Sequence, residues 1–116
     1  MESLGELSRS ISGRVAIVTG AASGMGRATA HLFSDEGASV AVCDVNTDGV
    51  DQVVNEICSA GGSASGYVID LDSASEINDL ISRIRNDLGP IDILVNNAGA
   101  VSYTHLRAHE TLRYLV

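Results

Sequence analysis

The chain has 116 residues, room for one domain, and a net charge of −8, with seven arginines and no lysine. This acidic balance argues against nucleic acid or an anionic membrane as a partner, because either would require basic patches. No apolar run is long enough to span a membrane, and residues 1–6 lack the basic and apolar regions of a signal peptide, so we expect a soluble, cytoplasmic protein.

Short apolar runs alternate with stretches of helical periodicity after a polar lead-in at 1–12, which we expect to be poorly ordered. Aromatic residues make up 3% of the chain, so we expect a core of Val, Ile, Leu and Ala, as in parallel strands that helices cover on both faces. In chain order the predicted elements are a strand at 15–19, a helix at 24–36, a strand at 39–44, a helix at 47–60, a strand at 64–70, a helix at 73–88 and a strand at 91–96.

The apolar spacing also predicts which positions of each helix face the core. These are Met25, Ala28, His31, Leu32 and Phe33 in the first helix, Val50, Val53, Val54 and Ile57 in the second, and Ile77, Leu80, Ile81 and Ile84 in the third. Gly37, Gly61 and Gly89 follow the three helices, and Ser73 with Glu76 forms a capping-box signature at the start of the third.

Alternation of strands and helices with short connections predicts an α/β fold with a parallel sheet and right-handed crossovers. We expect a truncated Rossmann-type, doubly wound parallel sheet in the strand order 3-2-1-4, formed by residues 13–100. In such sheets a ligand binds at the carboxyl ends of the strands, beside the switch point between strands one and four.

The stretch T-G-A-A-S-G-M-G at 19–26 joins the first predicted strand to the first helix. Its glycines, in order, suit a tight turn out of the strand, close approach of the backbone to a phosphate, and close packing of helix against strand. The helix that follows directs its unpaired N–H groups and positive dipole end at the anion. The segment predicts a pyrophosphate site, with a purely structural turn as the alternative.

Asp44 ends the second predicted strand, where a carboxylate can accept hydrogen bonds from a ribose diol. A cofactor with a phosphate at that position would meet like-charge repulsion, and Ser23 and Val45 carry no positive charge to bind it. The sequence therefore favours NAD(H) over NADP(H). A solvated acid, or an N-cap for the next helix, is the alternative for Asp44.

Two further polar segments follow predicted strands. In D-L-D at 70–72 an acid could accept a bond from an exocyclic amine and Leu71 could cover a ring face, although the spacing alone indicates a turn. In N-N-A-G at 96–99 the asparagine amides can bridge neighbouring strand ends, and the small residues leave space for a ribose and a nicotinamide.

Together these segments resemble the N-terminal half of the short-chain dehydrogenase/reductase family, whose marks include T-G-x-x-x-G-x-G, a D-[VL] pair after the third strand, and N-N-A-G. The resemblance covers about residues 12–100 and is nearest to the branch of 3-oxoacyl-carrier-protein reductases and related alcohol dehydrogenases. It implies an oxidoreductase that moves hydride between NAD(H) and a small carbonyl or alcohol substrate, with a homotetrameric full-length parent. The implied cofactor-binding residues are Thr19, Gly20, Ser23, Gly24, Met25 and Gly26 at the pyrophosphate, Asp44 at the ribose, Asp70 and Leu71 at the adenine, and Asn97, Ala98 and Gly99 beside the nicotinamide ribose.

The catalytic residues of the family have no match in this chain. Family members use a serine, a tyrosine and a lysine four residues after the tyrosine, several dozen residues beyond N-N-A-G. Tyr103 and Arg107 have that spacing but directly follow the fourth strand, and arginine is not a compact donor like lysine. We expect this chain alone to be inactive. A nucleotide-binding regulatory or redox-sensing protein on the same fold is the alternative function.

Neither the cysteines nor the histidines predict a metal site. Cys43 and Cys58 lack a metal or redox spacing and are interpreted as small buried hydrophobes in a reducing compartment. His105 and His109 are four residues apart, but few carboxylates lie near them in the sequence.

The segment 101–111, V-S-Y-T-H-L-R-A-H-E-T, resembles one translated frame of a transposon-end sequencing adapter. We therefore expect residues 101–116 to be a tail outside the family sequence. A sheet that ends at its fourth strand would keep an open edge and exposed apolar surface, which favours aggregation.

Overall fold

Most strands of the sheet are formed by short apolar runs of the sequence. A computed structural model, which describes residues 11–70, 74–97 and 114–115, contains β1 (Val15–Thr19), β2 (Ser39–Asp44), β3 (Ser63–Val68), β4 (Ile93–Asn96) and the two-residue β5 (Tyr114–Leu115). Neighbouring strands are parallel, in the order β3-β2-β1-β4-β5. The predicted order of the first four strands is confirmed.

The fifth strand was not predicted, and it comes from the tail that we expected to lie outside the fold. Tyr114 and Leu115 pair with Ile93 and Leu94 of β4. The expectation that β4 forms a wholly open edge is therefore wrong for its first two residues.

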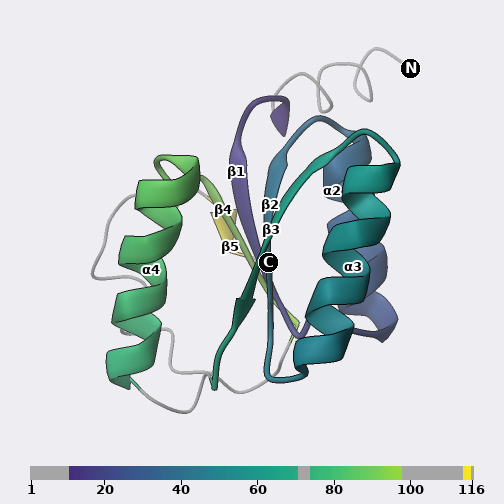
Figure 1. Cartoon of the computed structure of the whole chain (residues 1–116). Coiled ribbons are helices and arrows are strands. Elements are labelled where there is room, and N and C mark those ends of the chain that lie inside the picture. Colours follow the sequence, from purple (N-terminus) through teal and green to yellow (C-terminus); the bar gives the residue numbers. More distant parts are fainter. Residues whose placement is uncertain (1–10, 71–73, 98–113, 116) are drawn as a thin grey trace.

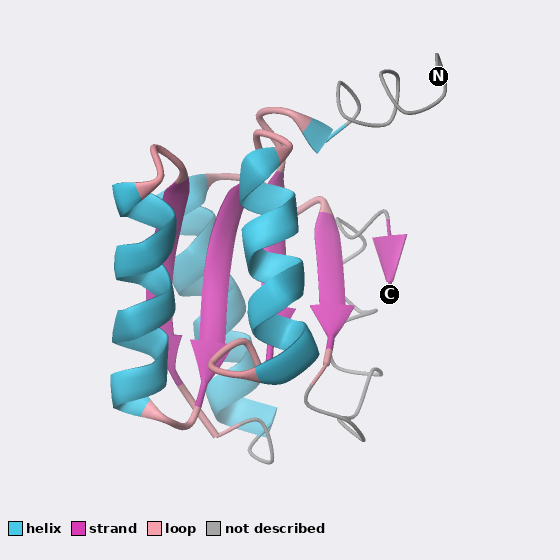
Figure 2. Ribbon diagram, turned by 90° about the vertical axis from the view of Figure 1, so that its right-hand side faces the viewer, coloured by secondary structure: helices cyan, strands magenta, loops and turns pink. Residues whose placement is uncertain are grey.

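Helices cover both faces of the sheet. α2 (Gly24–Asp35) and α3 (Thr47–Ser59) lie on one face and α4 (Ala74–Leu88) lies on the other (Figure 1), and Figure 2 looks onto the face that α2 and α3 cover. Successive residues of a strand point to opposite faces, so each strand contributes to both layers. Along β1, Val15 and Ile17 pack with α4, whereas Ala16 and Val18 pack with α2 and α3.

The two cores are aliphatic, as predicted, apart from Tyr67 and Cys43. The core beneath α4 consists of Val15, Ile17, Ala41, Cys43, Tyr67, Ile69, Ile77, Leu80, Ile81, Ile84, Ile91 and Leu94. The core beneath α2 and α3 consists of Ala16, Val18, Ala21, Ala30, Ala38, Val40, Val42, Val50, Val53, Ile57, Ile93 and Val95. None of the described helices is both long and apolar enough to span a bilayer.

Element boundaries shift by one or two residues from the prediction, while β1 and β2 match it. β3 ends two residues before the predicted limit, although the Ile69 amide still donates to the Asp44 carbonyl at 3.0 Å. β4 begins at Ile93 instead of residue 91, and Asp92 already contacts β1, since its carboxylate accepts from the Val15 amide at 3.2 Å. Ser73 of the predicted capping box lies outside the described residues.

The buried face of α2 differs from the predicted one. Gly26 and Ala30 are its buried residues, whereas Met25 and Leu32 are 76% and 55% exposed. Small residues let α2 lie close to the sheet, and of its larger apolar side chains Phe33, as predicted, packs partly buried against the core, whereas Met25 and Leu32 face outward. Hydrophobicity is a poor guide to the orientation of such a helix.

The prediction that both cysteines are buried is right for Cys43 and wrong for Cys58, which is exposed. Cys58 directly follows Ile57, a buried residue of α3. Successive residues of a helix are rotated by about 100°, which turns the Cys58 side chain toward solvent.

Candidate functional site

The carboxyl ends of three neighbouring strands meet at one edge of the sheet. Thr19, the last residue of β1, is in register with Cys43 of β2 on one side and with Asn96 of β4 on the other. The turn at 20–26 therefore leaves the sheet at its centre, between Asp44 and the asparagine pair. This is the switch point at which ligands bind in open α/β sheets.

The glycines of the turn meet three different steric conditions. Gly20 has a φ of +62°, a left-handed conformation that favours glycine, and it turns the chain out of β1. A Cβ atom at Gly26 would lie 2.0 Å from the Gly20 carbonyl oxygen, so helix and turn can approach this closely only without a side chain. A Cβ at Gly24 would meet nothing within 4 Å. The predicted turn and close packing are thus confirmed, and the backbone at Gly24 is open to a ligand.

The first amides of α2 are available to an anion. Arg27 is the first residue after the turn whose amide is hydrogen-bonded among the described residues, and it donates to the Ser23 carbonyl at 3.3 Å. The N-cap Ser23 makes no side-chain hydrogen bond to the helix. Within the described part of the chain, no acceptor contacts the amides of Gly24, Met25 and Gly26. Unpaired amides at the positive end of a helix are a common anion site.

Asp44 lies beside this turn and holds it. Its Oδ2 accepts from the Ala22 amide and its Oδ1 from the Asn46 amide, both at 3.1 Å. The N-cap of α3 is Asn46, whose side chain accepts from the Gly49 amide at 3.1 Å, so Asp44 is not the cap. An ionised carboxylate offers about four acceptor positions, and about two therefore remain for hydroxyl groups. The contact with Ala22 was not predicted, because a main-chain donor leaves no mark in the sequence.

The asparagine pair bridges strand ends, as predicted. The Thr19 hydroxyl contacts Asn96 Oδ1 at 3.0 Å and the Val95 carbonyl at 3.3 Å, and Asn97 Nδ2 donates to the Gly20 carbonyl at 3.4 Å. Thr19 is buried, with 4% of its surface exposed. Thr19 thus connects the start of the turn to the end of β4, and Asn97 holds the turn at Gly20.

The remaining predicted site residues are only partly described. Ser23 and Met25 are exposed on the turn, and Asp70 is exposed beyond the end of β3. Leu71, Ala98, Gly99 and the tail residues Tyr103, His105, Arg107 and His109 lie outside the described residues. No group of three His, Cys, Asp or Glu side chains among the described residues is placed to hold a metal ion.

Two titratable groups near the sheet belong to the core. Burial raises the pKa of the Cys43 thiol to about 12, so this thiol stays neutral. Burial, followed by a 2.7 Å hydrogen bond to Asp87, raises the pKa of Tyr67. The Arg83 guanidinium lies 5.1 Å from the centre of the Tyr67 ring. These contacts join α4 to β3.

Comparison with known proteins identifies the family. The family model for short chain dehydrogenases matches residues 14–113, a range that continues past residue 100, where we expected the family sequence to end. The 3-oxoacyl-[acyl-carrier-protein] reductase of Thermotoga maritima is 38% identical over 89 residues, which are 77% of this chain and 36% of that protein. The chain spans about a third of the length of the curated relatives it matches.

Two solved structures share both fold and sequence with the chain. A 7α-hydroxysteroid dehydrogenase in complex with NADH and 7-oxo glycochenodeoxycholic acid has a TM-score of 0.73 and 42% identity, over 74% of this chain and 34% of that one. A metagenomic short-chain oxidoreductase in complex with NADP has a TM-score of 0.74 and 37% identity, over 78% of this chain and 41% of that one. The chain therefore belongs to the short-chain dehydrogenase/reductase family.

Proposed function

We propose that this chain is the cofactor-binding part of a longer oxidoreductase that moves hydride between NAD(H) and a carbonyl or alcohol carbon of a small molecule. The observation that carries the proposal is the set of unpaired amides at Gly24, Met25 and Gly26, in the same turn whose Ala22 amide donates to the Asp44 carboxylate. Membership of a family of dehydrogenases and reductases supports it.

We assign the diphosphate to the turn at 20–26. Its oxygens would accept from the amides of Ser23, Gly24, Met25 and Gly26, a contact that needs only backbone and that the open space at Gly24 allows. Thr19 and Asn97 would hold the turn without contacting the diphosphate, since both hydrogen-bond to the strand ends or the turn itself.

We assign the adenosine ribose to Asp44. Relatives in this family have been solved with NADH and with NADP, so the choice depends on this chain's own residues. The acceptor positions left on the Asp44 carboxylate suit the two hydroxyls of an unphosphorylated ribose, whereas a 2′-phosphate would be repelled. The exposed Ser23 and Val45 offer no compensating charge, which supports NAD(H).

The residues that would contact the adenine and the nicotinamide ribose are assigned by family resemblance. Asp70 and Leu71 would contact the adenine, and Asn97, Ala98 and Gly99 would lie beside the nicotinamide ribose. When bound, the nicotinamide supplies or accepts the hydride. The residues of this chain bind and orient the dinucleotide, and the chain contains no lysine that could complete the family's proton-transfer set.

We further propose that this proton-transfer set lies in a continuation of the gene and that residues 101–116 are adapter read-through. We expect the full-length parent to be a cytoplasmic homotetramer. The nucleotide sequence tests the read-through: codons at 101–111 that differ from those of the adapter contradict it. A downstream Ser and Tyr-x-x-x-Lys set in the recovered gene favours the enzyme, and its absence favours the regulatory or redox-sensing alternative.

Binding of NADH and NADPH to the full-length protein tests the cofactor assignment. We expect tighter binding of NADH by the wild type, and we expect Asp44→Arg to shift the ratio of the two dissociation constants by about tenfold or more toward NADPH, because the 2′-phosphate gains a cation. Asp44→Asn is the control: it keeps one oxygen for the Ala22 amide and removes the like-charge repulsion without adding a positive charge, so it should weaken NADH binding and improve NADPH binding less than Asp44→Arg does. An unchanged ratio in Asp44→Arg would remove Asp44 from the ribose site.

A further inference from the structure

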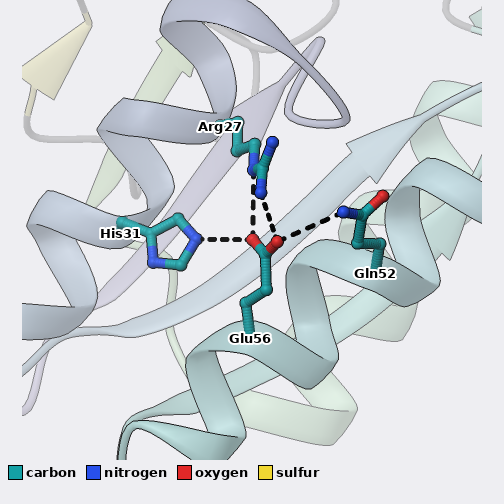
Figure 3. Close-up of polar contacts among 4 residues, drawn as sticks. All are labelled: Arg27, His31, Gln52 and Glu56. Atoms are coloured by element: carbon teal, nitrogen blue, oxygen red, sulfur yellow. Dashed lines mark hydrogen bonds and ion pairs between the residues drawn. The ribbon is translucent and has the colours of Figure 1, made fainter.

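A cluster of four polar side chains joins α2 to α3 (Figure 3). Glu56 of α3 accepts two hydrogen bonds from Arg27 of α2, one from Nε to Oε1 at 3.1 Å and one from Nη2 to Oε2. His31 Nε2 lies 2.8 Å from the same Oε1, and Gln52 Nε2 donates to Oε2 at 3.3 Å. We call these residues the Glu56 cluster.

The geometry of the Glu56 cluster is more fixed than that of an ordinary surface ion pair. Both oxygens of Glu56 are engaged by Arg27, and a two-bond contact between guanidinium and carboxylate restricts the position of both groups. The Glu56 side chain is 27% exposed. Hydrogen bonding from Arg27, and then from His31, lowers the pKa of Glu56 below its usual value, so the carboxylate is ionised at neutral pH.

The cluster contacts α2 where the candidate phosphate turn ends. Arg27 is the residue whose amide closes the first helical turn onto Ser23, and His31 lies one turn further along α2. The Arg27 guanidinium is occupied by Glu56 instead of being directed toward the turn.

The β2–α3 unit contacts the same turn at a second place. A Cβ atom at Gly49 of α3 would lie 2.6 Å from the Ala22 Cβ, and the Asp44 carboxylate accepts from the Ala22 amide. β2 and α3 therefore hold the turn at two places. Asp44 and Gly49 contact Ala22 near its start, and Glu56 contacts Arg27 just after its end.

We infer that Glu56 is a positioning residue for the dinucleotide: by holding Arg27 and His31 it fixes the first two turns of α2 and, with them, the amides that receive the diphosphate. This inference rests on the proposed function. Glu56 does not touch the cofactor and acts through α2.

Replacement of Glu56 by glutamine separates positioning from charge. If Glu56 only neutralised Arg27, Glu56→Gln would free a guanidinium near the diphosphate and tighten NADH binding. Positioning predicts the opposite sign, a dissociation constant for NADH about fivefold to twentyfold higher, because small displacements of binding groups are costly. Arg27→Gln should give a similar loss, and the double variant should be no weaker than either single variant, since the two residues act as one unit.

Asp51→Asn is the matched control. Asp51 is an exposed residue of α3, so this variant removes the same charge from the same helix without touching the cluster. Its NADH affinity should stay within about twofold of the wild type in the full-length protein.

Amide hydrogen exchange of the ligand-free protein gives an independent measurement. In Glu56→Gln we expect exchange at the hydrogen-bonded amides of Ala21, Ala22 and Arg27 to rise more than exchange in β2, whereas a general loss of stability alone would raise both alike. Unchanged exchange at 20–27, or NADH binding as tight as in Asp51→Asn, would overturn the inference. Failure of the wild type to bind NADH would instead refute the proposed function.

Discussion

α2 and α4 cover opposite faces of the same sheet, but they are attached to it by different means. α4 buries large aliphatic side chains, including Ile77, Leu80 and Ile84. α2 fully buries only Gly26 and Ala30, with Phe33 partly buried, and its outer side is tied to α3 by the Glu56 cluster. The comparison indicates a division of tasks: α4 contributes apolar burial to stability, whereas α2 is placed close to the glycine turn at 20–26 at the cost of apolar contact.

The largest expected effect comes from α4. Ile84 is fully buried, so Ile84→Ala should lower the free energy of unfolding by about 2–5 kcal/mol through lost burial and a residual cavity. At a temperature where the variant is folded, its NADH affinity should be unchanged within about twofold. Denaturant unfolding of the full-length protein measures the first quantity, with the exposed Ser82→Ala as control. A loss below about 1 kcal/mol would contradict the role given to α4.

A substitution in the buried face of α2 should lower the NADH affinity, which Ile84→Ala leaves unchanged, and should lower stability less than Ile84→Ala does. The added methyl of Gly26→Ala would lie 2.0 Å from the Gly20 carbonyl oxygen, so the turn must move. We expect a moderate loss of stability, about 1–3 kcal/mol as for other overpacked sites, together with at least about a tenfold loss of NADH affinity. Titration with NADH measures the affinity, and Ala28→Ser, at an exposed position of α2, is the control. Retained affinity would show that the amides at 24–26 do not receive the diphosphate.

The smallest expected effect is the pH dependence of stability, which should differ between the Glu56 cluster and the apolar core beneath α4. Because the folded-state pKa of Glu56 is lowered, chiefly by Arg27, its contribution to stability is complete above the unfolded value of about 4.3 and is lost as the pH falls through the folded value. The difference in melting temperature between the wild type and Glu56→Gln should therefore be largest at neutral pH and disappear in acid.

Thermal unfolding of the same variants between neutral and acidic pH measures this dependence. The deficit of Ile84→Ala, which involves no titratable group, should persist over the whole range. A Glu56→Gln difference that stays constant with pH would show that the Glu56 carboxylate is not the source of the stabilisation.

Features that depend on local patterns were predicted well. β1 and β2 were found at the predicted residues, and the buried positions of α4 follow the predicted spacing of its large aliphatic side chains. The glycine turn was predicted because positive φ and close packing demand glycine at particular positions. The position of Asp44 at the edge of the sheet was predicted because Asp44 is the last residue of a strand.

Features that depend on contact between two distant segments were either not predicted or predicted wrongly. The buried face of α2 has a weak hydrophobic signal, since its fully buried residues are glycine and alanine and only Phe33 adds a large apolar side chain. Asp44 meets the Ala22 amide, and Glu56 meets Arg27, only after the crossovers place β2 and α3 beside the turn. The pairing of Tyr114 and Leu115 with β4 is likewise a contact between remote segments.

Taken alone, the sequence determined the order of strands and helices, the position of the glycine turn at 20–26 and the acid at the end of β2, because each rests on residue types at short spacing. Only the tertiary structure decided how that turn is held. Its supports are a carboxylate from the neighbouring strand, two asparagines at the carboxyl end of β4 and a glutamate from the next helix, and these come together through packing between elements that no short stretch of sequence contains.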